Sequence, residues 1–222
     1  MMKLIRRLIA WPNRRLLFQV LVGRNRSREV EDGRFEHNDV RDLLERSERI
    51  AGELMSSVPH EKTMGARMMV KTGAMTMALF RAMREQGIEA GYAIELCTDY
   101  MWQGYKRRVA LPRIVARLTS RDPQTQMDRI QRFFLGYPLA SPGYECHAVE
   151  GESCASYDIR RCPVNDYFAT QDEEAQQFFR NSWCTLDWPL AEHLVEGGSY
   201  ERRRTLSHGD SVCDMRWRVR PR

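Results

Sequence analysis

The sequence lacks several features that would assign it quickly to a class of protein. It contains no zinc-finger spacing, no RNA-binding signature and no glycine-rich phosphate loop, so nucleic-acid binding is not expected. It has no internal repeat and no low-complexity tract, and the apolar run LLFQVLVG is far too short to span a bilayer. With 42% hydrophobic and 29% charged residues, its composition is that of a soluble globular protein, which excludes disorder and collagen-like structure.

Acidic residues are missing from the first 28 residues, which contain eight basic side chains. The chain as a whole has 35 basic and 30 acidic residues, so the remainder holds 27 basic residues against 30 acidic ones. The net charge of +5 therefore resides in this N-terminal arm, which again argues against nucleic acid. Apolar residues recur in the arm at helical spacing, at Leu4, Ile5, Leu8, Ile9, Leu16, Leu17, Val20 and Leu21. We expect residues 1–28 to pack on their own domain, to contact a second subunit in a homodimer, or to lie on an anionic membrane surface.

Closely spaced cysteine pairs are also absent. None of the six cysteines stands in a Cys-x-x-Cys pair, the spacing that makes zinc sites recognisable. The segment MMKLIRRLIAW carries charges where a secretory signal needs an unbroken apolar region, and no small-residue cleavage site follows it. A chain of 222 residues is large for a fold that depends on disulfides. We therefore expect a cytoplasmic protein with reduced thiols and no cofactor, with zinc at the C-terminal cysteines as the alternative.

Helical periodicity dominates the first part of the chain. Asn38 or Asp39 is expected to cap a helix that ends near Ser57, after a polar linker over residues 27–39. A methionine-rich helix over residues 61–86 is expected to end at Gly87, with its methionines mainly in the core. Two further helices are expected over residues 89–108 and 112–134, the second beginning at Pro112.

Short strands replace the helical pattern after the segment GYPLASPG. YECHAVE and SCASYDIRRC are typical of strands, and YERRRTL and SVCDMRWRV predict a hairpin that turns at SHGD. A helix is expected between these strand pairs, over PVNDYFATQDEEAQQFFRNSWC. A run of helices followed by strands predicts an α+β fold, an N-terminal helical layer followed by a small antiparallel β-sheet with inserted helices. The expected organisation is an arm and linker over 1–36 and one domain over 37–222, helical over 37–135 and sheet-containing over 142–220.

The last 61 residues contain three cysteines among acidic and aromatic neighbours. Cys162, Cys184 and Cys213 could be inert core residues, since free cysteine is often buried. They could bind zinc together with His208 or an acid. Alternatively, one thiolate could attack an electrophilic carbon while a carboxylate moves the proton. The residues alone leave these three interpretations open.

Three segments closely resemble the signature blocks of the L-2-amino-thiazoline-4-carboxylic acid hydrolase family: YDIRRCPVNDYF, WCTLDWPLAEHL and RRTLSHGDSVCDMRWR. The helical segment GAMTMALFRAMREQGIEAGYAIELCTDYMWQGY fits the upstream region of that family, and the resemblance covers residues 60 to 220. The enzyme that gives the family its name opens a cyclic amidine on a bacterial route to cysteine. The resemblance implies a cofactor-independent hydrolase that acts on a C–N or C–S bond of a small cyclic amidine-type compound. The matching positions are Cys162, Cys184, Asp187, Gly209, Asp210, Cys213 and Asp214.

A second similarity bears on the chemistry. SWCTLDWPL is similar to the Trp-Cys-x-Leu-Asp segment of organomercurial lyase, an enzyme that uses two cysteines and an aspartate to break a carbon–mercury bond. We therefore expect Cys184 to act as the nucleophile and Asp187 to carry the proton, while Cys162 and Cys213 line the pocket. Arg160 or Arg161 is expected to hold a substrate carboxylate, and Asp210 and Asp214 to contact the substrate. The alternatives are a small-molecule-binding or sensing domain without turnover, a thiol-based organomercurial lyase, or a metal-handling protein.

Overall fold

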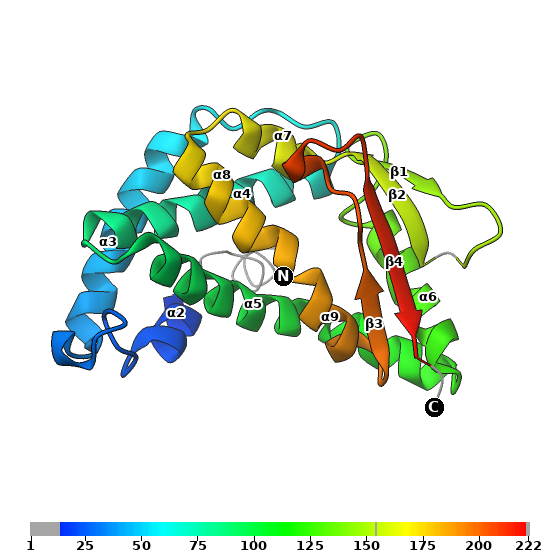
Figure 1. Ribbon diagram of the computed structural model, residues 1–222, viewed down its shortest axis with the longest axis horizontal. Coiled ribbons are helices and arrows are strands. Elements are labelled where there is room, and N and C mark those ends of the chain that lie inside the picture. The colour runs from blue at the N-terminus through cyan, green and yellow to red at the C-terminus, as the bar shows by residue number, and fades with distance from the viewer. Residues whose placement is uncertain (1–13, 154, 221–222) are drawn as a thin grey trace, which may run out of the picture. The chain divides into compact units, whose positions relative to one another are not determined.

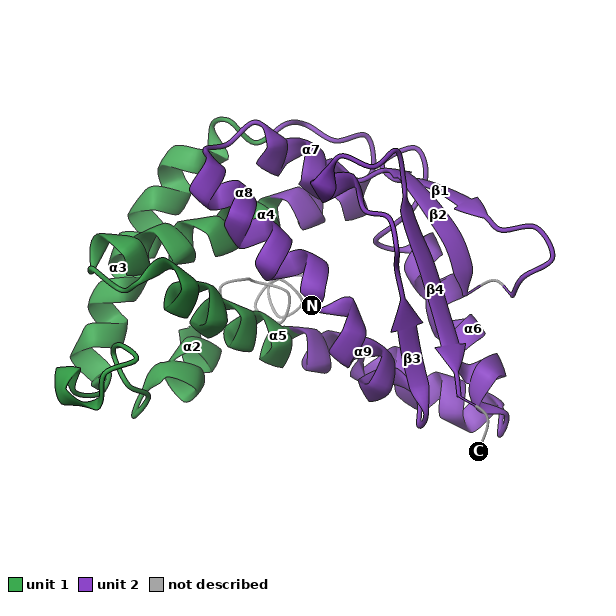
Figure 2. Ribbon diagram, viewed as in Figure 1, with its two compact units in different colours: residues 1–58, 71–104 green, residues 59–70, 105–222 purple. Residues whose placement is uncertain are grey.

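The computed structural model of the protein describes residues 14–153 and 155–220. These residues form helices and one four-stranded antiparallel sheet, so the predicted α+β class is confirmed (Figure 1). The chain divides into two compact units, which Figure 2 shows in different colours. Unit 1 comprises residues 1–58 and 71–104, and unit 2 comprises residues 59–70 and 105–222.

The described part of the N-terminal arm is integrated into unit 1. It begins with α2 (Arg14–Leu21), which packs on α3 (His37–Met55). The side of α2 that is buried carries three leucines, Leu16, Leu17 and Leu21. After the short helix η1 (Val30–Asp32), Phe35 is also buried, and Arg24 forms an ion pair with Asp99 on α5 (Ala90–Thr119). Residues 1–13 lie outside the described residues, so the membrane and dimer contacts expected for them stay predictions.

The first long helix begins earlier than the sequence suggested. Its N-cap is Glu36, not Asn38 or Asp39, because Glu36 and Asp39 form a reciprocal capping box. The Asp39 carboxylate accepts a hydrogen bond from the backbone N–H of Glu36 at 2.7 Å, and the Glu36 side chain accepts one from the third helical residue. The next helix, α4 (Met64–Glu85), ends before Gly87 as predicted, and Gly87 adopts a left-handed conformation with φ of 80°.

Helix α5 contradicts the predicted break at Pro112. One helix of 30 residues runs from Ala90 to Thr119 with Pro112 inside it, and the following helix, α6 (Pro123–Gly136), begins at Pro123 with Asp122 as its N-cap. Proline removes one backbone hydrogen bond from a helix, but tertiary contacts on both sides of Pro112 hold this one together. Val109 is buried before it, and Arg113 after it donates a hydrogen bond to the carbonyl of Leu194. Within the described residues, none of the helices combines the length and apolar character needed to cross a bilayer.

The sheet of unit 2 has the strand order β1-β2-β4-β3, from β1 (Glu145–Ala148), β2 (Ser156–Arg161), β3 (Gly198–Glu201) and β4 (Cys213–Val219). Figure 1 shows β4 between β2 and β3. One face is apolar, as alternation along β4 predicted, because Met215 pairs with Tyr157 and Trp217 pairs with Tyr200. Helix α6 contacts this face through a hydrogen bond from Tyr157 Oη to Gln131 Oε1 at 3.0 Å.

Two predicted elements in this part of the chain are present but differ in detail from the prediction. The segment 163–184 forms two helices, α7 (Pro163–Ala169) and α8 (Glu173–Asn181), because Asp172 caps a new helix through the N–H of Ala175. The last two strands do pair antiparallel as the predicted hairpin requires, with Tyr200 opposite Trp217. The tight turn at SHGD is replaced, because β3 ends at Glu201 and residues 202–212 form a long connection that contains the short helix η3 (Leu206–His208). This connection carries the side chains of the candidate site.

Candidate functional site

Unit 2 brings together the three C-terminal cysteines from three separate elements. Cys162 precedes α7, Cys184 lies in the short helix η2 (Trp183–Thr185), and Cys213 is the first residue of β4. Burial raises the pKa of the Cys162 thiol, and the neighbouring Cys213 and Cys184 thiols add to the effect. The sulfur atoms therefore share one environment. All five cysteines within the described residues are free thiols.

A chain of weak hydrogen bonds links two of these thiols through the connection before β4. The Cys184 thiol donates to Ser207 Oγ at 3.5 Å, and Ser207 Oγ lies 3.3 Å from Thr205 Oγ1. Thr205 Oγ1 lies 3.4 Å from Cys213 Sγ, which also accepts the backbone N–H of Leu206 at 3.3 Å. The two thiols are thus connected by hydroxyl groups that can both donate and accept hydrogen bonds.

Cys184 is a protonated thiol when no ligand is bound. Burial raises its pKa to about 11, although the hydrogen bond to Ser207 and the positive charge of Arg202 act in the opposite direction. A thiol is a poor nucleophile until it loses its proton. Reaction at Cys184 therefore requires a base nearby, or a cation that lowers its pKa.

The carboxyl group of Asp187 is the candidate for this base. Asp187 is the first residue of α9 (Asp187–Leu194), one helical turn after Cys184 in the sequence. Burial raises its pKa to about 6, while the charge of Arg202 and a hydrogen bond with Tyr200 oppose the shift. A carboxyl group with a pKa of about 6 can both accept and donate a proton near neutral pH.

Arg202 contacts both Cys184 and Asp187, and no sequence pattern distinguishes it from Arg203 and Arg204. Its guanidinium donates to the backbone carbonyl of Cys184 at 2.6 Å and lies 3.5 Å from the Asp187 carboxylate. The side chain is only 7% exposed, and it lies over the ring of Trp188 at 4.9 Å. This arginine therefore sets the position of both groups.

Two tyrosines complete the surroundings of the thiols, and the sequence reasoning did not identify them. Burial raises the pKa of Tyr105 on α5, with Asp187, Cys162 and Cys184 adding to the shift, so Tyr105 lies in the same environment. Tyr144 is buried and hydrogen-bonded to Cys162. Both hydroxyls stay protonated at neutral pH and can donate hydrogen bonds to a developing negative charge.

The two aspartates expected to contact a substrate are engaged with the protein backbone. Asp214 Oδ1 accepts the N–H groups of Arg203 at 2.9 Å and Arg204 at 2.7 Å. Asp210 Oδ2 accepts the N–H of Thr205 at 2.7 Å, across a turn where Gly209 adopts a left-handed conformation with φ of 91°. Both carboxylates hold the connection that carries Arg202 and Ser207.

The two arginines expected to hold a substrate carboxylate differ in their surroundings. Arg161 donates to Glu61 Oε1 at 2.9 Å, to the carbonyl of Gly143 at 2.6 Å, and lies 3.1 Å from Asp166. Its guanidinium is therefore already occupied by acidic partners. Arg160 alternates with Arg161 along β2 and is exposed on the other face of the sheet.

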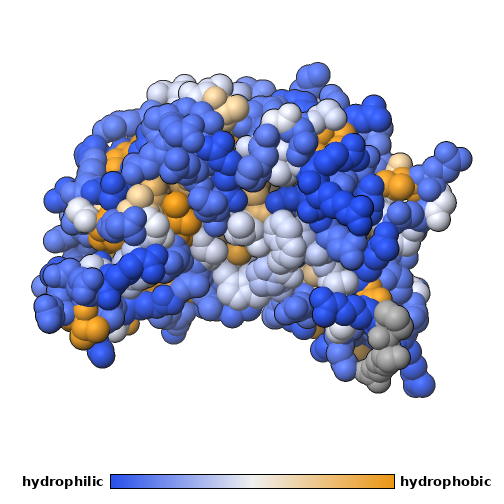
Figure 3. All heavy atoms as spheres, viewed as in Figure 1, coloured by the Kyte–Doolittle hydropathy of each residue, from blue (hydrophilic) through white to orange (hydrophobic). Residues whose placement is uncertain are grey.

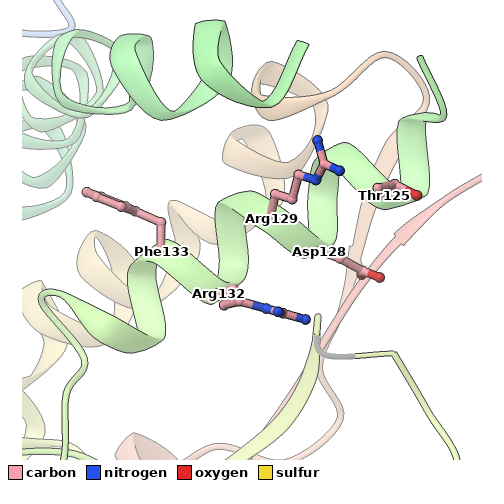
Figure 4. Close-up of a pocket in the computed structure, with 5 residues that line it drawn as sticks. All are labelled: Thr125, Asp128, Arg129, Arg132 and Phe133. Atoms are coloured by element: carbon pink, nitrogen blue, oxygen red, sulfur yellow. The ribbon is translucent and has the colours of Figure 1, made fainter. Parts of the chain in front are cut away.

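Two hollows in the surface of unit 2 contain none of the three thiols. One of about 530 Å³ is lined by five residues of α6, and Figure 4 shows these side chains projecting from that helix: Thr125, Asp128, Arg129, Arg132 and Phe133. A second hollow of about 260 Å³ is lined in part by Cys146 and Tyr157. Burial raises the pKa of Cys146 to about 12. Cys146 is thus a half-buried thiol apart from the three grouped cysteines and serves as a control for them.

Comparison of the chain with protein-family models, with curated proteins and with solved structures gives no match. Among residues 14–153 and 155–220, no group of three or more His, Cys, Asp or Glu side chains is placed to hold a metal ion. The resemblance described above and the zinc alternative therefore both stay predictions.

Proposed function

We propose that the protein is a thiol-dependent hydrolase that opens a C–N or C–S bond of a small cyclic amidine-type compound. The observation that carries the proposal is the Cys184–Arg202–Asp187 arrangement, in which a half-buried thiol and a carboxyl group with a pKa of about 6 both contact one arginine through their residues. The family resemblance of the surrounding segments supplies the substrate class.

The first step makes the nucleophile. A protonated amidine beside Cys184 adds a positive charge, which lowers the pKa of the thiol toward that of Asp187. Asp187 accepts the thiol proton, and the sulfur lone pair forms a bond to the amidine carbon. The electrons of the C=N bond move to nitrogen, which gives a tetrahedral adduct.

The second step returns the proton. The adduct collapses, the ring C–N or C–S bond breaks, and the leaving atom takes the proton from Asp187. The carboxylate then accepts a proton from water as the water oxygen bonds to the same carbon, which gives a second tetrahedral adduct. This adduct expels the sulfur of Cys184, which takes that proton from Asp187 and leaves as a thiol. One water molecule is consumed, and the enzyme returns to its starting state.

Turnover of 2-amino-thiazoline-4-carboxylate and related cyclic amidines tests this proposal. We expect Cys184→Ala and Asp187→Asn each to lower kcat/KM by about a hundredfold or more, because each removes a group that reacts or moves a proton. Cys146→Ala, a half-buried thiol apart from the three grouped cysteines, and Asp42→Asn, an exposed carboxylate on α3, serve as matched controls and should retain activity. Full turnover by both site variants would show that the assignment is wrong.

A small-molecule-binding domain without turnover is the second candidate. The raised pKa of Cys184 favours it, since a protonated thiol without a ligand is typical of a binding residue rather than an activated nucleophile. Calorimetric titration of the same amidines distinguishes the two. A binding domain gives heat of binding without product, and its affinity survives Asp187→Asn.

A further inference from the structure

The C-terminal half of α5 and the turn after it carry positive charge without any negative charge. Residues 100–121 contain no aspartate or glutamate and six basic residues: Lys106, Arg107, Arg108, Arg113, Arg117 and Arg121. Arg107, Arg117 and Arg121 are exposed. This segment lies outside the first 28 residues, where the composition alone placed the basic character of the protein.

Four large apolar side chains lie exposed within the same segment, and we call them the α5 stripe. Leu111, Ile114, Val115 and Leu118 are 69%, 55%, 51% and 82% exposed. They make up half of the eight large hydrophobic residues that are exposed within the described chain. Their spacing of three, four and seven residues places them on one face of the helix.

The opposite face of this helix packs against the rest of unit 2, so the α5 stripe is not needed for folding. Val109 and Ala116 are buried, and Arg113 turns inward to the Leu194 carbonyl and to the ring of His193 at 3.0 Å. On the face shown in Figure 3, hydrophilic residues predominate and hydrophobic ones form small separate groups. Four exposed apolar side chains in line depart from that pattern and indicate a binding surface.

We propose that the α5 stripe and the arginines around it bind the surface of an anionic lipid membrane, with the helix lying parallel to the bilayer. An apolar face inserts among the acyl chains while flanking arginines pair with lipid phosphates, which is the arrangement of interfacial amphipathic helices. The proposal is independent of the function proposed for the thiol site.

The chemistry of the surface favours a membrane over a protein partner. A second copy of the chain would bring the exposed Arg117 and Arg121 of each copy close together, and like charges oppose such pairing. A helical peptide needs a groove, whereas side chains exposed by 51% to 82% have no walls beside them. A flat anionic surface satisfies both the charge and the shape.

Co-sedimentation of the full-length protein with vesicles tests the proposal. Vesicles of phosphatidylcholine alone are compared with vesicles of phosphatidylcholine and phosphatidylglycerol. We expect binding only to the anionic vesicles, weakened by added salt. Ile114→Ser combined with Leu118→Ser should lower the partition coefficient about tenfold or more, because two apolar side chains no longer insert. Arg117→Ser combined with Arg121→Ser should lower it about tenfold through the lost charge.

Matched variants separate this surface from the rest of the molecule. Val30→Ser changes a residue that is 74% exposed on η1, and Arg41→Ser changes an exposed arginine on α3; both should bind as the unmodified protein does. The proposal would be overturned if the α5 variants bound vesicles as well as the unmodified protein does while Arg6→Ser combined with Arg7→Ser abolished binding. That result would assign membrane binding to the arm. Absence of vesicle binding by the unmodified protein would overturn the proposal too. A solution mass that shows dimers only when the α5 stripe is intact would also overturn it, because the stripe would then bind a second copy of the chain.

Discussion

The guanidinium of Arg202 influences the pKa values of its neighbours because its single positive charge is shared between Cys184 and Asp187. It donates to the carbonyl of Cys184 and faces the carboxylate of Asp187 at 3.5 Å, so its charge only partly offsets the burial of that carboxylate. The pKa of Asp187 therefore stays at about 6 instead of falling below 3.8. An ion pair with ideal geometry would leave Asp187 permanently ionised and unable to deliver a proton.

Asp187→Asn should make the protein more stable at neutral pH while it lowers activity. Folding raises the pKa of Asp187 from 3.8 to about 6, so the folded state binds more protons between these values, and stability falls as the pH rises through them. The Asp187→Asn variant has no carboxyl group at this position, so its unfolding free energy does not fall in this way as the pH rises. We expect its free energy of unfolding to exceed that of the unmodified protein by up to roughly 3 kcal/mol above pH 6 and to match it near pH 4. Urea unfolding at the two pH values measures this, and an equal difference at both would contradict it.

At the scale of elements, the connection over residues 202–212 depends on one side chain of β4. Burial disfavours the charge of Asp214, but the N–H groups of Arg204 and Arg203 outweigh it and hold the pKa of Asp214 below its usual value. The same connection carries Arg202 and Ser207 to Cys184. Asp214 therefore acts on the site through the backbone.

Asp214→Ala should lower both stability and activity. Two backbone donors lose their acceptor, which costs about 1–3 kcal/mol of unfolding free energy. A depressed pKa contributes stability above the pKa of the unfolded state, so the difference should shrink as the pH falls below about 4. Urea unfolding over that range, with Asp42→Asn as the exposed control, measures the effect. An unchanged unfolding free energy at neutral pH would show that the connection is held by other contacts.

The elements also show where sequence reasoning reaches its limit. The α+β class and the apolar face of β4 follow from periodicity, which depends only on which side of an element is buried. The helix break predicted at Pro112 was wrong. Proline destabilises a helix through its own backbone position, which the sequence shows, whereas the contacts of Val109 and Arg113 that outweigh this effect are made with residues distant in sequence. Cys162, Cys184, Asp187 and Cys213 were grouped from the sequence, and they do lie together. Arg202 could not be chosen from a run of three arginines, since only tertiary packing buries one of them.

At the scale of the whole molecule, basic residues are distributed over two regions with different surroundings. In the arm, Arg24 pairs with Asp99 and Arg28 pairs with Glu95 at 2.5 Å, so acids of unit 1 neutralise part of its charge. In residues 100–121 no acid is available within the segment. Exposed basic residues therefore occur in residues 100–121 as well as in the described part of the arm.

The packing of α2 predicts that the described part of the arm cannot be removed without loss of stability. Leu17 is fully buried, and Leu17→Ala should lower the free energy of unfolding by about 2–5 kcal/mol. Arg15→Ala, two residues away and exposed, should change it by less than about 0.5 kcal/mol. Chemical denaturation of both variants measures the difference. If both variants had the same free energy of unfolding, the packing of residues 14–21 would contribute nothing to the stability of the protein.

The anchoring of residues 203 and 204 to Asp214 bears on the entropy of ligand binding at the candidate site. A loop that closes over its substrate must lose conformational entropy in every catalytic cycle. Here the loss occurs once, during folding, because a strand residue fixes the backbone that carries Ser207. Under the proposed function, the free energy of substrate binding therefore does not include the entropic cost of ordering this part of the backbone.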